Sequence, residues 1–438
     1  MPDKKDSDFR YNTGAARVPW AAVAEDYGRV DVLEIVKFLM QGEDAEYEQA
    51  VDAVGGALKK LDALSSPPGK LSLGPKVGEL EERIDRYLNT AGSLFVANAT
   101  AGFEIAFKYA GIGPGDEVIV PAITFIATMA YPLHMGAKIV FADVDKKTLN
   151  MDPADVERKI TSKTKMIVPV HIGGYAVDMD PIMALAKKHD LVVLEDAAHG
   201  FGGGYKSKKL GTIGHFGAFS FHEVKNATSF GEGGILCTNI ESFIPEMKRA
   251  RFLGLNFTRT IKDWLYDITA IPGKYGPSVA GNSSATEIQA VGLLLQLDRY
   301  EKIMEARRTS AAYLTEKLSG NPAVVPQDLG NADIEPTFHL YQLQIVPELC
   351  GGKNVQVFKQ KLSNKGVVNI PHFGPLYRFD LLREFGYDRE AIAATCPNCE
   401  EVFYNRYTHV TTYGLTRDQL DYMADAILES VEEMKANK

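Results

Sequence analysis

Short apolar runs alternate with helical patterns through the middle of the chain, and this alternation restricts the fold more than any other feature. A chain that repeats strand and helix in this way forms a mostly parallel sheet with helices on both faces. Leu191–Leu194 is the clearest strand, because four branched apolar residues in a row are typical of a strand buried on both faces. The strand-like runs are 94–97, 117–120, 138–141, 165–170 and 191–194, and the helical patterns are 103–110, 153–159 and 179–189.

Two charged residues follow neighbouring strand signals. Asp196 comes directly after the 191–194 run, and Lys225 comes a few residues after the short run 219–221. Ligands of open parallel sheets bind at the carboxyl ends of the strands. A lysine and an acid there suit pyridoxal phosphate (PLP), because the lysine forms a Schiff base with the aldehyde and the acid pairs with the pyridinium nitrogen. From spacing alone, a solvated lysine and a helix-capping aspartate are equally good explanations.

Three motifs around these residues favour the PLP site over the solvated lysine and the capping aspartate. Glu195-Asp-Ala-Ala-His199, Ser220-Phe-His-Glu-Val-Lys225 and Gly231-Glu-Gly-Gly234 resemble, in order and spacing, the signatures of the DegT/DnrJ/EryC1 family. The members of this family are PLP-dependent aminotransferases that act mostly on keto sugars and cyclitols. The resemblance runs from about Lys70 to the C-terminus.

The resemblance implies a fold-type I aminotransferase. We expect a large domain with a mostly parallel seven-stranded sheet flanked by helices, followed by a smaller α+β C-terminal domain. The predicted segments are a disordered N-terminus at 1–17, N-terminal helices at 18–69, the PLP-binding large domain at 70–295 and the small domain at 296–438.

The resemblance also assigns cofactor contacts. Asp196 is expected at the pyridine nitrogen, and His199 stands where the family often has a glutamine near the phenolic oxygen. The phosphate is expected at Thr100, Ala101 and Ser220. The first two open a helix, and a helix N-terminus is a ready anion site. In the family this step usually reads Ser-Gly-Thr, and Ala99 replaces its glycine here. Phe125 is expected to stack on the pyridine ring, with a core phenylalanine as the alternative.

Lys225 also bears on the reaction. Some members of the superfamily have a histidine at this position and act as sugar dehydratases, so lysine favours transamination. The amine, once neutral, would shuttle a proton to and from the α-carbon of the amino donor. We expect L-glutamate or L-glutamine as donor and a keto sugar (possibly nucleotide-linked) or keto-cyclitol as acceptor. A PLP-dependent dehydratase or lyase and a non-catalytic PLP-binding regulator remain alternatives.

Residues 280–290 resemble a family segment that reads Gly-x-Asn-x-Arg-Met-x-x-x-Gln-Ala. There the asparagine, here Asn282, reaches the phosphate of the neighbouring subunit, which implies a homodimer with shared active sites. Ser284 replaces the arginine of that pattern. The segments holding His339, His372 and Tyr377 resemble the part of the family's small domain near the acceptor, so these three are weaker candidates for substrate contacts.

Charge and composition bear on the partners. The net charge is −9, from 48 basic and 57 acidic residues, and no long basic run occurs, so we expect no nucleic-acid partner. No apolar segment approaches the roughly 20 residues of a membrane span. The polar start of the chain lacks the apolar core of a signal peptide, so we expect a cytoplasmic protein. Cys396 and Cys399 have zinc-like spacing, but no second pair completes a four-ligand set, and we expect no metal.

The segment 44–64 is an addition to the expected family pattern. Its apolar residues recur at steps of three and four, which predicts an amphipathic helix, and 30–40 predicts another helix before it. Gly55 and Gly56 weaken the middle of the second helix. Its apolar stripe must be buried against this subunit or against a partner.

Overall fold

The computed structural model of the chain describes residues 27–64, 71–256, 267–370 and 372–436. These residues form two compact units, which are described separately: a short N-terminal unit that contains residues 27–64, and a much larger unit that begins at Ser72. The disorder predicted for residues 1–17 lies outside the described residues. No helix in the described part of the chain is long and apolar enough to cross a membrane.

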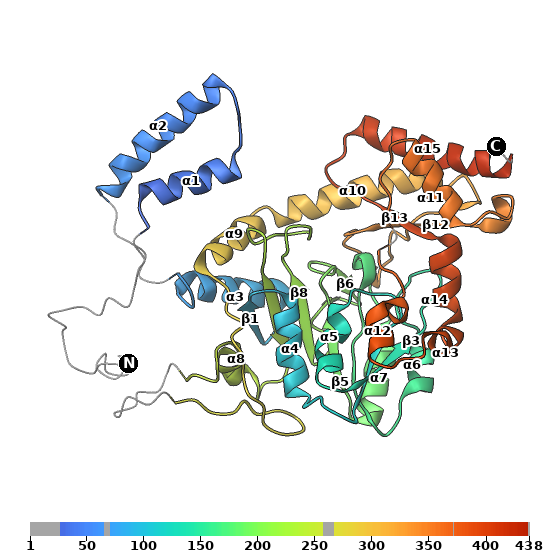
Figure 1. Cartoon of the computed structure of the whole chain (residues 1–438), viewed down its shortest axis with the longest axis horizontal. Coiled ribbons are helices and arrows are strands. Elements are labelled where there is room, and N and C mark those ends of the chain that lie inside the picture. Colours follow the sequence, from blue (N-terminus) through green and yellow to red (C-terminus); the bar gives the residue numbers. More distant parts are fainter. Residues whose placement is uncertain (1–26, 65–70, 257–266, 371, 437–438) are drawn as a thin grey trace. The chain divides into compact units, whose positions relative to one another are not determined.

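The N-terminal unit is a hairpin of two helices, α1 (Arg29–Leu39) and α2 (Ala45–Asp62), which pack side by side (Figure 1). Asp44 caps α2, because its side chain accepts a hydrogen bond from the backbone N–H of Tyr47 at 2.7 Å. The two glycines do not interrupt the helix. A Cβ on Gly55 would lie 3.3 Å from Cδ2 of Leu33, so the glycine gives α1 room to approach. Within this pair only Val51 is buried.

The large unit is built on a seven-stranded sheet, which confirms the α/β fold-type I prediction. Five strands pair in parallel with one another. β9 pairs antiparallel with β8, and β1 pairs antiparallel with β9, so only β9 runs in the opposite direction. Across the sheet the strands are β1 (Gly92–Val96), β9 (Gly234–Thr238), β8 (Phe216–Ser220), β5 (Val192–Asp196), β4 (Thr164–Ile167), β2 (Glu117–Pro121) and β3 (Lys138–Ala142).

Helices cover both faces of this sheet (Figure 1). Side chains of a strand alternate between faces, so neighbours in β5 enter different cores. Leu194 packs in the cluster that contains α4 and α5, whereas Val193 packs in the cluster that contains α7. The helices are α3 (Pro75–Leu88), α4 (Ala99–Tyr109), α5 (Ala127–His134), α6 (Pro153–Lys159), α7 (Met179–His189), α8 (Ile244–Arg251) and α9 (Glu287–Leu297).

The C-terminal part has a core of its own around a small antiparallel sheet. Its strands are β10 (Val324–Val325), β12 (Tyr341–Ile345) and β13 (Tyr407–Val410), with β12 in the middle. Its helices are α10 (Tyr300–Leu318), α11 (Val355–Asn364), α12 (Asp380–Glu384), α13 (Arg389–Ala394), α14 (Pro397–Glu401) and α15 (Arg417–Lys435). A third small sheet joins β6 (Gly204–Tyr205), β7 (Lys208–Lys209) and β11 (Ile334–Glu335).

Candidate active site

A cavity of about 440 Å³ opens at the carboxyl ends of β5 and β8, beside the start of α4. Ligands of open α/β sheets bind at this position, outside the carboxyl ends of the strands. The lining includes most of the residues predicted from the sequence. They are Thr100, Phe125, Asp196, His199, Ser220, Lys225, His339 and His372.

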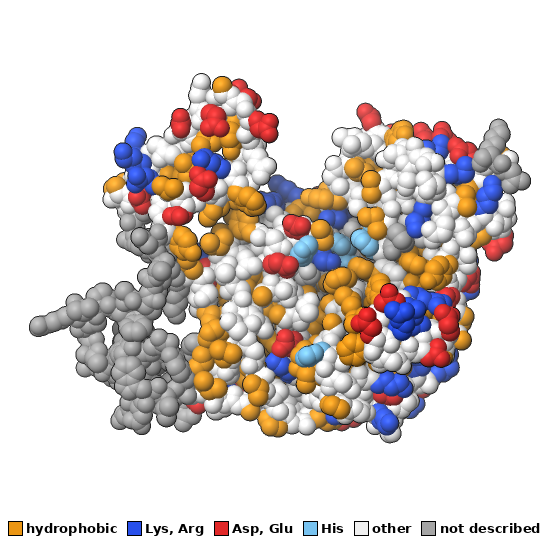
Figure 2. All heavy atoms as spheres, viewed as in Figure 1, with side chains coloured by type: hydrophobic (Ala, Val, Ile, Leu, Met, Phe, Trp, Pro, Cys, Tyr) orange, Lys and Arg blue, Asp and Glu red, His pale blue; other side chains and the backbone are white. Residues whose placement is uncertain are grey.

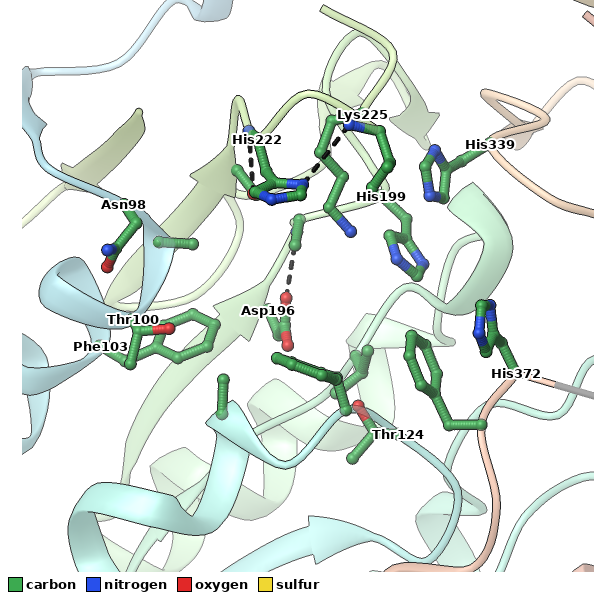
Figure 3. A pocket seen from close by; sticks show the side chains of 18 of the residues that line it. Asn98, Thr100, Phe103, Thr124, Asp196, His199, His222, Lys225, His339 and His372 are labelled. Carbon is green, nitrogen blue, oxygen red and sulfur yellow. Dashed lines mark hydrogen bonds between the residues drawn. The ribbon is translucent and has the colours of Figure 1, made fainter. Parts of the chain in front are cut away.

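Asp196 is the last residue of β5, and its side chain points into the cavity (Figure 3). It is buried, and its Oδ1 accepts a hydrogen bond from the backbone N–H of Ala198 at 3.0 Å. Burial raises the pKa of Asp196 to about 6, although the Ala198 N–H and the charge of Lys225 both oppose the rise. A cationic group bound against this carboxylate would offset the cost of its burial.

Glu195, the preceding residue, points to the other face of the sheet. Its carboxylate is fully buried and accepts backbone N–H groups of Gly211, Ile213 and Gly214 at 2.6 to 2.9 Å. His171 lies 2.9 Å from the same carboxylate. These contacts hold the loop that enters β8, so Glu195 fixes β8 beside β5 without touching the cavity. No role was predicted for Glu195 from the sequence.

Lys225 lies in the loop between β8 and β9, and its side chain enters the cavity toward Asp196 and His199 (Figure 3). The loop is closed at its base by two backbone hydrogen bonds, from Phe221 N–H to Gly233 O at 2.8 Å and from Ser229 N–H to Phe221 O at 3.0 Å. Burial lowers the pKa of Lys225, and the nearby charge of Asp196 partly opposes this effect. A lowered pKa increases the fraction of neutral amine, which is the form that acts as nucleophile and base.

The start of α4 forms another side of the cavity. Asn98 caps the helix, and its Oδ1 accepts the N–H of Ala101 at 2.9 Å. Ala101 therefore already has a partner for its N–H and does not line the cavity, whereas Thr100 does. Ser220, at the end of β8, adds a second hydroxyl to the lining. A helix N-terminus with two hydroxyl groups is suited to an anion.

His199 is buried and is held in one tautomer. Its Nδ1 accepts the backbone N–H of Gly173 at 3.2 Å, so the ring proton is on Nε2. Burial, followed by the charge of Lys225, lowers the pKa of His199 well below its ordinary value. The ring stacks on His339 with centroids 4.1 Å apart. Figure 2 shows several histidine side chains close together on one face of the molecule.

The far wall of the cavity comes from the C-terminal part of the chain. His339 lies next to Asn226, with 2.9 Å between Nδ1 and Oδ1. His372 and Phe373 come from the segment after β12 and α11, and the ring of Phe373 lies 5.7 Å from that of Phe125. Phe125 is 53% exposed, so its ring is not part of the core.

Besides Ala101, two other predicted residues lie outside the lining of the cavity. Asn282 does not line this cavity, and its side chain accepts the N–H of Ser284 at 3.1 Å. Tyr377 is fully buried and donates its hydroxyl to Glu400 at 2.6 Å, outside the cavity lining. Cavity residues that the sequence analysis did not select include Phe103, Thr124, His222, Glu232 and Phe373. Thr124 and Phe373 are each adjacent in sequence to a predicted residue, and this adjacency could have indicated that they line the cavity.

The residues present fit pyridoxal phosphate. Lys225 offers an amine for its aldehyde, Asp196 a buried carboxylate for its pyridinium nitrogen, and Thr100 with Ser220 hydroxyls for its phosphate. The buried hydroxyl of Thr124 lines the cavity and has no hydrogen-bond partner among the described residues, so it has capacity for a ligand. Among the described residues, no group of three or more His, Cys, Asp or Glu side chains is arranged to hold a metal ion.

Comparisons with known proteins agree with this geometry. The DegT/DnrJ/EryC1/StrS aminotransferase family matches residues 60–428. The chain is 32% identical over 370 residues to the spore coat polysaccharide biosynthesis protein SpsC of Bacillus subtilis, covering 83% of this chain and 91% of that protein. It is 31% identical to a UDP-4-amino-4-deoxy-L-arabinose–oxoglutarate aminotransferase of Shewanella sediminis, covering 81% and 89%.

A solved structure is also similar. The PLP form of the putative sugar aminotransferase Spr1654 from Streptococcus pneumoniae superposes with a TM-score of 0.73 at 29% identity, covering 85% of this chain and 95% of that one.

Proposed function

This chain belongs to the DegT/DnrJ/EryC1/StrS aminotransferase family and is a PLP-dependent aminotransferase, and from that premise we propose that it moves an amino group from L-glutamate or L-glutamine to a keto sugar or keto-cyclitol. The observation that carries the proposal is the pair of Lys225 and Asp196 in one cavity at neighbouring strand ends. When bound, PLP supplies an electron sink for negative charge on the donor's α-carbon.

The residues of this chain have separate tasks in that reaction. Lys225, whose burial favours the neutral amine, takes the proton from the α-carbon of the donor and later returns a proton to the acceptor carbon. With the cofactor bound, Asp196 would keep its charge for the pyridine nitrogen, and His199 would be free to donate a hydrogen bond through Nε2. Thr100 and Ser220 would hold the phosphate, and Phe125 would orient the ring.

The sugar class of the acceptor is supported by relatives. One relative is named for spore coat polysaccharide biosynthesis and another for an amino-arabinose nucleotide. Two histidines form part of the far wall: His339 is half-buried and His372 is exposed. Their ring nitrogens can form hydrogen bonds with the hydroxyl groups of a sugar or cyclitol. The second relative is named for oxoglutarate, the keto acid that corresponds to L-glutamate, which supports glutamate as a donor.

A homodimer with shared sites belongs to the same proposal. Hydrophobic side chains are exposed in the single chain on the loop that carries Lys225, at Val224 and Phe230, and on α9, at Ile288 and Leu295. Asn282 lies outside its own cavity, which fits a residue that reaches a neighbouring one. We also propose a cytoplasmic location, which the four free and buried cysteines fit.

The test is the visible absorption spectrum of the purified protein with PLP, before and after each amino acid. Conversion of the cofactor to its amine form by L-glutamate or L-glutamine identifies the donor. Keto sugars and keto-cyclitols are then tested for return of the original spectrum, with mass spectrometry of an aminated product. Loss of water or ammonia without an aminated product would instead identify a dehydratase or lyase. Failure to bind PLP would refute the roles of Lys225 and Asp196.

A further inference from the structure

The helical hairpin of α1 and α2 has surface that nothing in the described structure accounts for. The family match begins at residue 60, so α1 and nearly all of α2 lie outside the part shared with the family. The hairpin buries almost nothing between its two helices, since only Val51 is buried. A pair of helices this short needs additional apolar contact to be stable.

The outer face of α2 carries a regular apolar stripe. Ala50, Val54, Ala57 and Leu61 of α2, and Leu64 two residues past its end, are all exposed and follow steps of four, three, four and three residues. This spacing gives positions a and d of a heptad, the pattern by which one helix pairs with another. Leu61 is 60% exposed and Val54 is 38% exposed, so the stripe is bare in the single chain. Figure 2 shows hydrophobic side chains on the surface of this hairpin.

α1 has a bare stripe as well. Leu33 and Val36 are half-buried, and Leu33 lies against Gly55 of α2. On another side, Val32, Ile35 and Leu39 recur at steps of three and four and are exposed. Each helix thus uses one apolar side within the hairpin and presents a second one outward. Two hairpins that join through their outward sides make a four-helix bundle.

The charged residues beside the α2 stripe favour a second α2 helix as the partner and an antiparallel orientation of the pair. With Val54 at position a, Glu46 and Lys60 both occupy position g, two heptads apart. In an antiparallel pair, position g of one helix faces position g of the other, and charged residues there set orientation. If a second α2 packs antiparallel, with Ala53 of both helices at the crossing point, Glu46 of each helix lies opposite Lys60 of the other. The two-fold symmetry gives two such pairs. A parallel pair would bring Glu46 beside the partner's position e, Val51, which carries no charge.

We propose that α2 pairs antiparallel with α2 of a second copy of this chain, so that the two hairpins form a four-helix bundle between subunits. Ala53 lies on the two-fold axis of this bundle. Two small residues of the stripe lie close to it, Ala50 and Ala57 at position d, and they let the two helices approach closely. The contact is isologous, because the same stripe serves both copies.

The first test uses cross-linking of the full-length protein with PLP bound. Ala53→Cys places a thiol on the axis, and the four native cysteines are buried. A short bis-maleimide should join two chains through Ala53→Cys and not through Ala45→Cys, an exposed position on the far side of α2. Equal cross-linking of the two variants, or none in either, would overturn the proposal. In the second case another chain or the rest of the same chain covers the stripe.

The second test reverses the charges in the Ala53→Cys background. Lys60→Glu should slow cross-linking by on the order of tenfold, because two attractive pairs become repulsive. Adding Glu46→Lys restores opposite charges across the axis and should restore the rate. Both residues are exposed, so the fold of the hairpin is retained. A rate that Lys60→Glu leaves unchanged, or that the double exchange fails to restore, would contradict the antiparallel arrangement.

Discussion

The cavity has two walls of different construction. The sheet-side wall consists of Asp196, Ser220 and the start of α4, all at the ends of regular elements that the main sheet holds in register. The far wall consists of His339, His372 and Phe373, from irregular segments of the C-terminal part. Rigid elements position reacting groups, whereas loops vary more freely. From this difference we propose that the sheet side performs the chemistry shared by the family and that the far wall selects the acceptor.

The largest effect should come from the sheet side. Lys225→Ala removes the amine that moves the proton, so kcat should fall on the order of 10⁴-fold in an assay of aminated product. Lys208→Ala, an exposed lysine in β7, is the control and should retain full activity. Comparable activity of Lys225→Ala and the native protein would remove this residue from the mechanism.

Asp196→Asn should have the next largest effect. Loss of one partner from a buried charge pair costs about 3–5 kcal/mol, which is on the order of 10²- to several 10³-fold in kcat/KM. Glu232→Gln provides a matched control, because Glu232 is an exposed carboxylate in the lining of the same cavity. It should change kcat/KM only a few fold. Equal losses in the two variants would show that burial of Asp196 has no special role.

The affinity for the cofactor should depend on pH through Asp196. Burial raises its pKa to about 6, so the carboxylate is ionised above that pH and protonated below it. The affinity for pyridoxamine phosphate should therefore be full above pH 6 and fall by up to tenfold per pH unit below it. The stability of the cofactor-free protein should depend on pH in the opposite direction. Because the pKa of Asp196 is raised in the folded state, its carboxyl group adds to the free energy of unfolding at low pH, and this contribution is lost as the pH rises from about 4 to 6.

Fluorescence titration between pH 5 and 8 measures this affinity. Asp196→Asn is the control, since the cofactor's own ionisation remains while the carboxyl is gone. The slope below pH 6 should be shallower in the variant. Identical pH profiles for the two proteins would assign the dependence to the cofactor phosphate alone.

A smaller effect is expected at His199, which stands between the two walls. His199→Phe removes a hydrogen-bond donor and should lower kcat/KM roughly three- to tenfold. His199→Gln keeps a donor and should recover most of this loss. We compare kcat/KM of each variant with that of the native protein at pH 7 and at pH 8. The native ring is neutral at both values, so each ratio should be the same at the two pH values. A loss in His199→Gln as large as in His199→Phe would exclude the hydrogen bond as the reason.

The far wall should give the smallest effect on the chemistry. His372→Ala should raise KM for the keto acceptor several-fold and leave the half-reaction with the amino donor unchanged, because the side chain is exposed and lies away from Asp196. Stopped-flow absorbance separates the two halves. An equal slowing of both would place His372 in the shared chemistry and remove the distinction between the walls.

The sequence predicted the sheet side well. Leu191–Leu194 identified β5, and its end placed Asp196, because strand direction and alternation follow directly from the pattern of apolar residues. The motif around Lys225 placed the lysine in the same cavity. The far wall was only partly predictable. His339 and His372 do line the cavity, but Tyr377, which is close to His372 in sequence, turns away and pairs with Glu400.

The reasons for these differences are physical. Irregular segments lack a period from which the direction of a side chain follows, so nothing local distinguished Tyr377 from Phe373. Glu195 was missed because its three backbone partners come from a loop 16 to 19 residues later, a tertiary arrangement without a local pattern. In the N-terminal hairpin the two helices were predicted, but the sequence did not show that Gly55 lies against Leu33 of α1.

The closed base of the loop that carries Lys225 has a kinetic consequence. Because backbone hydrogen bonds at Phe221 and Ser229 tie the loop shut, the amine changes position by rotation about its own side-chain bonds and not by movement of the loop. Such rotations take picoseconds to nanoseconds, whereas opening of a loop takes far longer. We therefore expect proton delivery by this lysine to need no conformational gate, so that the overall rate is set by the bond-breaking step or by exchange of the substrates.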